Sequence, residues 1–277
     1  MPLAYVISRN SRLKIQAGFG QLGLTIQDVS KAAGVSTKTV SRVLNGERYV
    51  SAVLKEKVER AVKQLGYKPN FAARALAGKR SFQIALIYEN PSPYFAQNIQ
   101  AGVMASCAEQ GYRMIAQPCA SGTPAALAEI EALIDQAQLD GVILTAPFTE
   151  NAGVRDMLKA RSLPYSMISP AQTDVAVASA SIDQSAGAQA MTAHLIAKGH
   201  RRIGFIAGSE RFATSARRLA GFKAALKVAD IDFDPALLRQ GDYDFTSGSK
   251  AAGELLALPV PPTAIFASSD DMAAGVL

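Results

Sequence analysis

The spacing of apolar residues changes once along the chain, near residue 82. Between residues 25 and 66 they recur at intervals of three or four, which is the spacing that lines one face of a helix. They form three groups, namely Ile26, Val29 and Ala33, then Val40, Val43 and Leu44, then Val58, Ala61, Val62 and Leu65. The pattern predicts three short helices around one apolar core.

Polar residues and glycines mark the ends of these helices. Thr25, with Asp28 three residues later, can satisfy the free N–H groups where the first helix begins. Gly34 suits the left-handed residue that ends a helix and turns the chain. The second and third helices have N-cap signals at Ser36 and Ser51 and stop signals at Asn45-Gly46 and Gly66. The first two helices should therefore be joined by a tight turn.

This arrangement is typical of a helix-turn-helix, in which the second helix presents its N-terminal side chains to the major groove. Arg42 can pair with both acceptors of guanine, Lys38 can donate to the same edge, and the Thr37 methyl can contact thymine. Ser36, Thr39 and the helix-start amides are expected to contact phosphates. A helical hairpin with a glycine turn can also be purely structural, so the spacing alone leaves that alternative open.

The charges are concentrated at the N-terminal end. Residues 1–80 hold 15 Lys and Arg against four acids, whereas residues 81–277 hold 14 against 19. A local basic excess can neutralise phosphates and steer association with nucleic acid, although a solvated basic surface is the alternative. The basic part therefore coincides with the predicted helix-turn-helix.

The segment after Gly66 reads as a conditional helix. Asn70 is a plausible N-cap and Gly78 a plausible C-cap, and a helix of about seven residues is only marginally stable alone.

The run TIQDVSKAAGVSTKTVSRVLNGERYVS, followed by VERAVKQLGYKPNFAARALAGKRS, closely resembles the lactose/galactose repressor (LacI/GalR) family of bacterial regulators. The match spans residues 25–81, and the rest of the chain fits the family core at lower specificity.

The resemblance implies a dimer whose hinge helices form on specific DNA and push a leucine into the minor groove. Leu76 occupies that position here, and an apolar wedge fits that chemistry. A hinge contact facing the core is the alternative role for Leu76. The complete set of DNA-binding candidates is Thr25, Ser36, Thr37, Lys38, Thr39, Arg42, Asn45, Asn70 and Leu76.

From residue 82 onward, β-rich runs alternate with Ala-rich helical stretches, which favours parallel doubly wound sheets. The first series has strands at 82–88, 113–117, 141–145 and 165–168 and helices near 94–110, 124–137 and 151–160. A second series starts near Ala178, with strands at 178–182, 202–207 and 264–267 and helices at 184–198, 214–228 and 245–257. We therefore expect an α/β core of two subdomains, similar to the periplasmic sugar-binding fold, with a ligand in the cleft between them.

The resemblance also points to residues that would contact a small-molecule effector, expected to be a sugar or sugar derivative. Arg218 can donate to hydroxyls or a carboxylate, and Tyr243 can stack on a sugar face. Ser169 stands where many sugar-sensing relatives carry an acid, so the hydroxyl recognised is open. Ordinary packing remains the alternative for the tyrosines, and a surface salt bridge for Arg218. The set is Asn90, Tyr94, Thr145, Ser169, Arg218, Tyr243 and Asp270.

Both ends of the chain depart from the family pattern. Residues 1–24, with Gly18, Gly20 and Gly23, show no clear period and are expected to form a flexible extension, with an artefact of start-codon choice as the alternative. The chain stops at Leu277, within a helix expected to begin near Asp270, where the family continues for several βα units. The expected organisation is thus an extension at 1–24, a helix-turn-helix domain at 25–69, a hinge helix and linker at 70–81, and an incomplete effector-binding core at 82–277.

Several classes of function find no support in the sequence. The apolar runs are far shorter than the roughly 20 residues of a spanning helix, and no apolar stretch forms a secretory signal, so we expect a cytoplasmic protein. Cys107, Cys119, His194 and His200 lack the spacing of a disulfide framework or metal site. Neither a catalytic motif nor a dinucleotide fingerprint occurs, so neither an enzyme nor a bound cofactor is expected.

The sequence therefore predicts a dimeric repressor or activator whose affinity for operator DNA changes when an effector binds the core. A periplasmic-type binding protein without DNA function is the second hypothesis, but the segment at 25–81 opposes it. An enzyme is a distant third.

Overall fold

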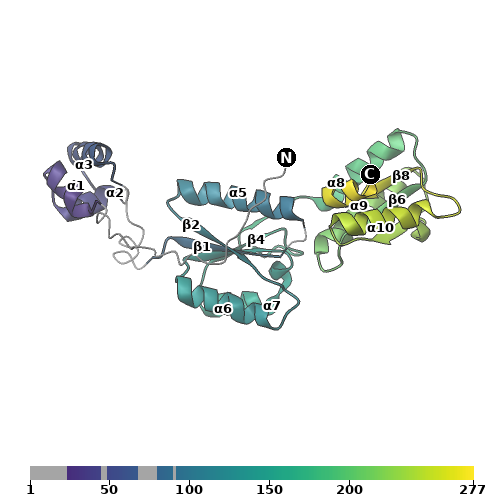
Figure 1. Cartoon of the computed structure of the whole chain (residues 1–277), viewed down its shortest axis with the longest axis horizontal. Coiled ribbons are helices and arrows are strands. Elements are labelled where there is room, and N and C mark those ends of the chain that lie inside the picture. The colour runs from purple at the N-terminus through teal and green to yellow at the C-terminus, as the bar shows by residue number, and fades with distance from the viewer. Residues whose placement is uncertain (1–23, 45–48, 68–79, 90–91) are drawn as a thin grey trace, which may run out of the picture. The chain divides into compact units, whose positions relative to one another are not determined.

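The computed structural model describes residues 24–44, 49–67, 80–89 and 92–277. The chain divides into two compact units between residues 74 and 75. We call the described part of the first unit the helical module and residues 80–277 the α/β core (Figure 1).

The helical module contains the three predicted helices. They are α1 (Ile26–Ala33), α2 (Thr37–Leu44) and α3 (Ala52–Leu65). Val29, Val40 and Val58, one from each helix, have no exposed surface, and Ala61 and Tyr67 complete the buried cluster. The apolar periodicity is confirmed, and Tyr67 adds an aromatic ring that it did not predict.

The predicted end signals of these helices are confirmed where the structure describes them, and Asn45-Gly46 lies outside the described residues. The Asp28 carboxylate accepts the Thr25 backbone N–H at 2.8 Å, although the Thr25 hydroxyl donates to that carboxylate rather than capping a backbone group. The Ser36 hydroxyl accepts the Thr39 N–H at 3.1 Å, and Ser51 caps α3. Gly34 takes a left-handed conformation with φ of 64°. These cap signals could be predicted from the sequence because each involves groups within a few residues of one another.

The first sheet of the α/β core has five parallel strands in the order β2-β1-β3-β4-β5. Helix α5 lies on one face, and α6 and α7 lie on the other (Figure 1). The strands are β1 (Gln83–Tyr88), β2 (Arg113–Pro118), β3 (Gly141–Thr145), β4 (Tyr165–Ile168) and β5 (Ser179–Ala180). The helices are α5 (Pro93–Glu109), α6 (Ala125–Ala137), the 3₁₀ helix η1 (Phe148–Glu150) and α7 (Ala152–Ala160).

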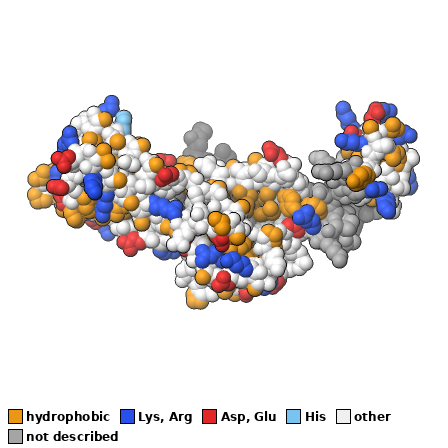
Figure 2. Space-filling view, turned by 180° about the vertical axis from the view of Figure 1, so that it is seen from behind, with side chains coloured by type: hydrophobic (Ala, Val, Ile, Leu, Met, Phe, Trp, Pro, Cys, Tyr) orange, Lys and Arg blue, Asp and Glu red, His pale blue; other side chains and the backbone are white. Residues whose placement is uncertain are grey.

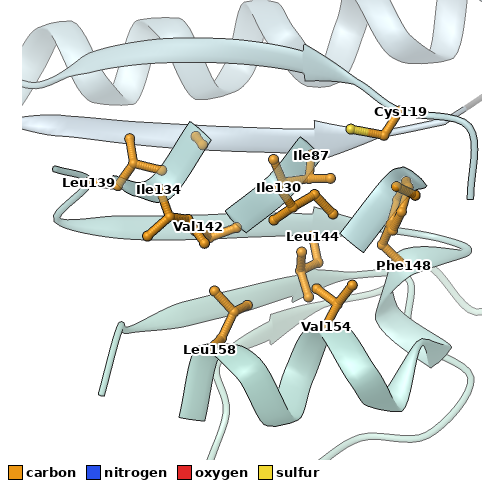
Figure 3. Packing of buried hydrophobic residues seen from close by; sticks show 12 residues of the cluster. Ile87, Cys119, Ile130, Ile134, Leu139, Val142, Leu144, Phe148, Val154 and Leu158 are labelled. Carbon is orange, nitrogen blue, oxygen red and sulfur yellow. The ribbon is translucent and has the colours of Figure 1, made fainter. Parts of the chain in front are cut away.

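The face under α6 and α7 is a dry apolar layer. Ile87 and Leu144 from the strands meet Ile130, Val154 and Leu158 from the helices, and all five are fully buried (Figure 3). Parallel sheets need cover on both faces, so this packing fixes the carboxyl ends of β1 and β3.

The second sheet is three-stranded and parallel, in the order β7-β6-β8. Successive residues of β6 face opposite sides, so Phe205 packs on Phe222 while Ile206 packs with Met272. The strands are β6 (Ile203–Ala207), β7 (Leu238–Gln240) and β8 (Ala264–Ala267). The helices are α8 (Gln184–Ala197), α9 (Ala213–Val228), the 3₁₀ helix η2 (Pro235–Leu237), α10 (Phe245–Leu256) and α11 (Asp270–Val276).

One expectation about the strands was wrong, and one strand was not predicted. The strand near 178–182 shrinks to Ser179–Ala180 and pairs with β4, so it closes the first sheet rather than opening the second. Sheet membership depends on pairing with a distant strand, which the sequence pattern does not encode. Strand β7 was missed because Arg239 and Gln240 leave it without apolar alternation.

Candidate functional site

The first candidate surface is the N-terminal part of α2. Ser36, Thr37 and Lys38 are exposed, while Thr39 and Arg42 are half-buried. These side chains lie at the start of α2 and along its first turns. The buried Val40 anchors the inner face of the helix. Because the buried Val40 anchors one face of α2, the polar residues of the helix are left at exposed or half-buried positions.

Several Lys and Arg side chains lie on the visible face of the helical module, with acidic and uncharged side chains between them (Figure 2). Glu56 and Glu59 on α3 pair with Arg60 at 2.7 Å and Lys55 at 3.8 Å, respectively. These two carboxylates of α3 are thus paired with basic side chains of their own helix. This arrangement leaves α2 with a positive surface suited to a polyanion.

The second candidate site is a cavity of about 310 Å³ in the α/β core. Residues after strand ends of both sheets line it, together with the starts of α5, α8 and α9. From the first sheet these are Ser92, Tyr94, Phe95, Asn98, Ala146, Ile168 and Ser169, and from the second Gln184, Phe212, Thr214, Arg218, Tyr243, Ser268, Ser269 and Asp270.

Arg218 is held in place by the second sheet. Its Nε donates to Gln184 Oε1 at 2.7 Å, and its Nη1 donates to the Ser268 carbonyl. The guanidinium carbon lies 5.9 Å from the centre of the Tyr243 ring. These contacts engage Nε and Nη1 of the guanidinium group and fix its orientation at the cavity wall.

Tyr243 forms part of the cavity wall in a constrained conformation. Its φ is 64°, its side chain is buried, and its hydroxyl lies 2.6 Å from Ser215 Oγ. A Cβ on Gly208 would come within 1.9 Å of Tyr243 Cζ, so only glycine fits there. The Tyr243 hydroxyl is therefore engaged by Ser215 within the protein. Only a small part of the ring surface is exposed and could contact a ligand.

Five of the predicted effector residues come together around the cavity, namely Tyr94, Ser169, Arg218, Tyr243 and Asp270. Ser169 holds a left-handed φ of 54°, and its backbone N–H donates to Ala180. Thr145 is not among the lining residues; it is buried, with its hydroxyl 3.4 Å from the Ile87 carbonyl, while the adjacent Ala146 lines the cavity. Asn90, Asn45, Asn70 and Leu76 lie outside the described residues.

Sequence reasoning missed part of the lining, chiefly Gln184, Phe212, Thr214, Ser268 and Ser269. Ser268 and Ser269 directly follow β8, and Phe212 lies in the loop after β6. The rule that ligands bind beyond strand carboxyl ends could have found these three. Nothing in the local pattern singles out Gln184, whose side chain accepts a hydrogen bond from the distant Arg218.

Other chemistry finds little support among the described residues. Burial raises the pKa of both the Cys107 and Cys119 thiols, which disfavours the reactive thiolate form. No cluster of three His, Cys, Asp or Glu side chains able to hold a metal occurs in that part of the chain. None of its helices combines the length and apolar character needed to span a membrane.

Two family models match the chain. Residues 25–70 match "Bacterial regulatory proteins, lacI family", and residues 81–277 match "Periplasmic binding proteins and sugar binding domain of LacI family". Together they cover the helical module and the α/β core.

Curated relatives and solved structures agree with these matches. The ribose operon repressor of Escherichia coli (strain K12) is 33% identical over 253 residues, covering 91% of this chain and 76% of the relative. The regulator CelR of Thermobifida fusca is 34% identical over 263 residues, covering 91% and 76%. The structure of the lac repressor dimer bound to operator and the anti-inducer ONPF has a TM-score of 0.70 at 30% identity, covering 92% of this chain and 76% of that one. The chain belongs to the lacI family of bacterial regulatory proteins.

Proposed function

We propose that this protein is a transcription repressor that binds operator DNA through the helical module and releases or tightens it when a small molecule fills the cavity of the α/β core. The observation that carries this function is the presence, in one chain, of an exposed basic helix α2 and a cavity lined from two sheets. Repression is favoured by the names of two relatives, the ribose operon repressor and the repressor CytR. A regulator of this kind works in the cytoplasm.

The DNA would be read by two copies of the chain. One α2 occupies one major groove, and two-fold protein symmetry then maps onto a near-palindromic operator. The lac repressor structure, which is a dimer on operator, supports this assembly. Thr37, Lys38 and Arg42 are the proposed base-reading residues, whereas Ser36 and Thr39 bond to each other at 2.9 Å and would face phosphates.

The effector class follows from the cavity walls. Aromatic rings from Tyr94, Phe95 and Phe212 provide apolar faces, and serine and threonine hydroxyls from both sheets provide polar ones. Arg218 and Asp270 bring one positive and one negative charge among the described lining residues. A neutral carbohydrate or a related polyhydroxyl compound satisfies this lining, whereas a phosphate dianion would face the Asp270 carboxylate.

The DNA part of the proposal is tested by selecting binding sites for the 277-residue chain from random duplexes. We expect enrichment of a near-palindrome with half-sites about one helical turn apart. Recovery of random duplexes only, with ligand binding intact, would instead support a small-molecule binding protein without DNA function.

The effector part is tested by calorimetry with D-ribose, cellobiose and D-ribose 5-phosphate. A neutral sugar should bind and change operator affinity, and D-ribose should bind at least about ten-fold more tightly than its phosphate, since about 1.4 kcal/mol of charge repulsion gives that ratio. Tighter binding of the phosphate would contradict the assigned effector class.

A further inference from the structure

One ion pair joins the two sheets beside the cavity. Glu89 follows β1 of the first sheet, and Arg211 lies in the loop between β6 and α9 of the second. Arg211 Nη1 donates to Glu89 Oε1 at 3.0 Å, across 122 positions of sequence. The Glu89 side chain is 19% exposed and that of Arg211 is 50% exposed. The pair is therefore partly shielded on the side of the first sheet.

Glu89 is prepared for this partner by its own sheet. Its second oxygen, Oε2, accepts the Ser121 backbone N–H at 2.8 Å, from the loop after β2. Burial raises the pKa of Glu89, but the Ser121 bond and the Arg211 charge together outweigh it and lower the pKa below its usual value. The carboxylate is thus charged and fixed in direction at neutral pH.

Arg211 is also tied to the cavity. Its guanidinium carbon lies 5.9 Å from the centre of the ring of Phe212, which lines the cavity from the second sheet. Arg211 shares a surface groove with Glu210, Asp242 and Glu254. It nonetheless pairs with Glu89 of the other sheet, and Arg239 pairs with Glu254 at 3.0 Å.

We propose that Glu89 and Arg211 form a clasp that holds the two sheets in the arrangement that encloses the cavity before any ligand binds. The role of this arrangement in effector sensing rests on the proposed function. A cavity lined from both sheets exists in this form only while the sheets keep these positions. A contact made only in that arrangement raises its population and spares the ligand part of the ordering cost.

The clasp is tested by the distance between nitroxide labels on the two sheets, which needs neither DNA nor ligand. Labels at Lys159→Cys, in the last turn of α7 beside the first sheet, and at Lys227→Cys, on α9, sit at exposed positions. The native Cys107 and Cys119 are buried, and a protein without added cysteines measures any labelling of them. Pulsed electron resonance then gives the distribution of separations.

Glu89→Gln keeps an oxygen for the Ser121 N–H and removes the charge, and Arg211→Gln removes the other partner. Each should raise the population of altered separations about two- to five-fold, the range for a partly exposed ion pair, and the double variant should add little. High salt should act in the same direction. Arg161→Gln, which breaks the Arg161–Asp135 pair within the first sheet's own layer, is the matched control and should leave the distribution unchanged.

Unchanged distributions in both single variants, or effects that simply add in the double variant, would overturn the clasp. Equal melting temperatures by circular dichroism would show that the variants fold. A failed clasp leaves the operator and sugar measurements untouched, and failure of those measurements leaves the label distances valid, so the two proposals fail separately.

Discussion

The helical module and the α/β core build their functional surfaces in opposite ways. In the module, the base-reading candidates lie within residues 36–42, on one short helix and the turn before it. In the core, the cavity residues come from both sheets and span positions 92–270. A surface made by one helix is visible in a local sequence pattern, whereas a cavity made by many loops depends on how two sheets fold.

The two regions also differ in whether the polar side chains of their functional surfaces face solvent or bond to one another. The module buries an apolar cluster and leaves the polar side of α2 toward solvent. The cavity engages its polar groups with one another, as Arg218 does with Gln184 and Tyr243 with Ser215. Changes on the polar side of α2 should therefore alter binding with little effect on folding, while changes in the cavity can affect both.

The largest effect is expected from Arg218→Ala. It removes a half-buried guanidinium that would donate charged hydrogen bonds to the effector, and it leaves Gln184 without that partner. Loss of two such bonds, at about 1.5–3 kcal/mol each, should weaken effector binding by about a hundred-fold or more in calorimetry. Operator affinity without effector should stay within a few-fold.

Arg201→Ala is the matched control for that variant. Arg201 is exposed and donates to the Ala229 carbonyl, away from the cavity lining. It should bind effector as the unmodified protein does. An Arg218→Ala protein that still responds to effector would move the sensing site out of this cavity.

A somewhat smaller effect is expected from Arg42→Ala on α2. The loss of a side chain that pairs with a base should cost about 1–3 kcal/mol on the operator and relax preference at one base pair of each half-site. Fluorescence titration with operator and with scrambled duplex measures the specific and the non-specific affinity, respectively. An equal loss on the two duplexes would make Arg42 a phosphate contact instead.

The buried face of α2 is tested by Val40→Ala. Val40 has no exposed surface in the small cluster of the module, and a cavity there should cost about 1–2 kcal/mol. Hydrogen exchange should accelerate in α1 to α3 and remain unchanged in β1 and β3. Val53→Ala, at a valine of α3 that is 63% exposed, is the control and should have little effect. Equal acceleration in both units would mean that they unfold together.

The same contrast explains which predictions from sequence succeeded. The caps at Thr25 and Ser51 and the left-handed Gly34 were found because their partners lie within a few residues. Strand β5 was assigned to the wrong sheet because its neighbour β4 is set by tertiary pairing.

The cavity shows more clearly which residues of a site cannot be predicted from local sequence patterns. Arg218 and Asp270 were identified through family resemblance, and the structure places both at the lining. Thr145, at the end of its strand as expected, is buried with its hydroxyl near the Ile87 carbonyl and does not line the cavity. Phe212 and Gln184 enter the wall because a loop and a helix start from the second sheet turn toward it, which no local spacing records.

The smallest expected effect concerns the start of α1. The Thr25 backbone N–H, and then its hydroxyl, hold the pKa of Asp28 below its ordinary value of 3.8. A depressed carboxyl pKa stabilises the folded state above the unfolded value, and that contribution is lost as pH falls through the folded value. The protection factors of the α1 amides, which correct for the intrinsic pH dependence of exchange, should therefore fall below about pH 4 by more than other acids cause.

Asp28→Asn isolates this contribution, because the asparagine does not titrate. At pH 7 the variant should exchange somewhat faster in α1 than the unmodified protein, and below pH 3 the two should converge, since the protonated Asp28 then resembles the amide. The first sheet should show the same exchange in both proteins at every pH. A difference between the two proteins that stays constant from pH 7 to pH 2.5 would show that Asp28 acts by packing or helix propensity. The charge of Asp28 would then not contribute to the stability of α1, and the local capping of the module would not differ from the packing of the core in its dependence on charge.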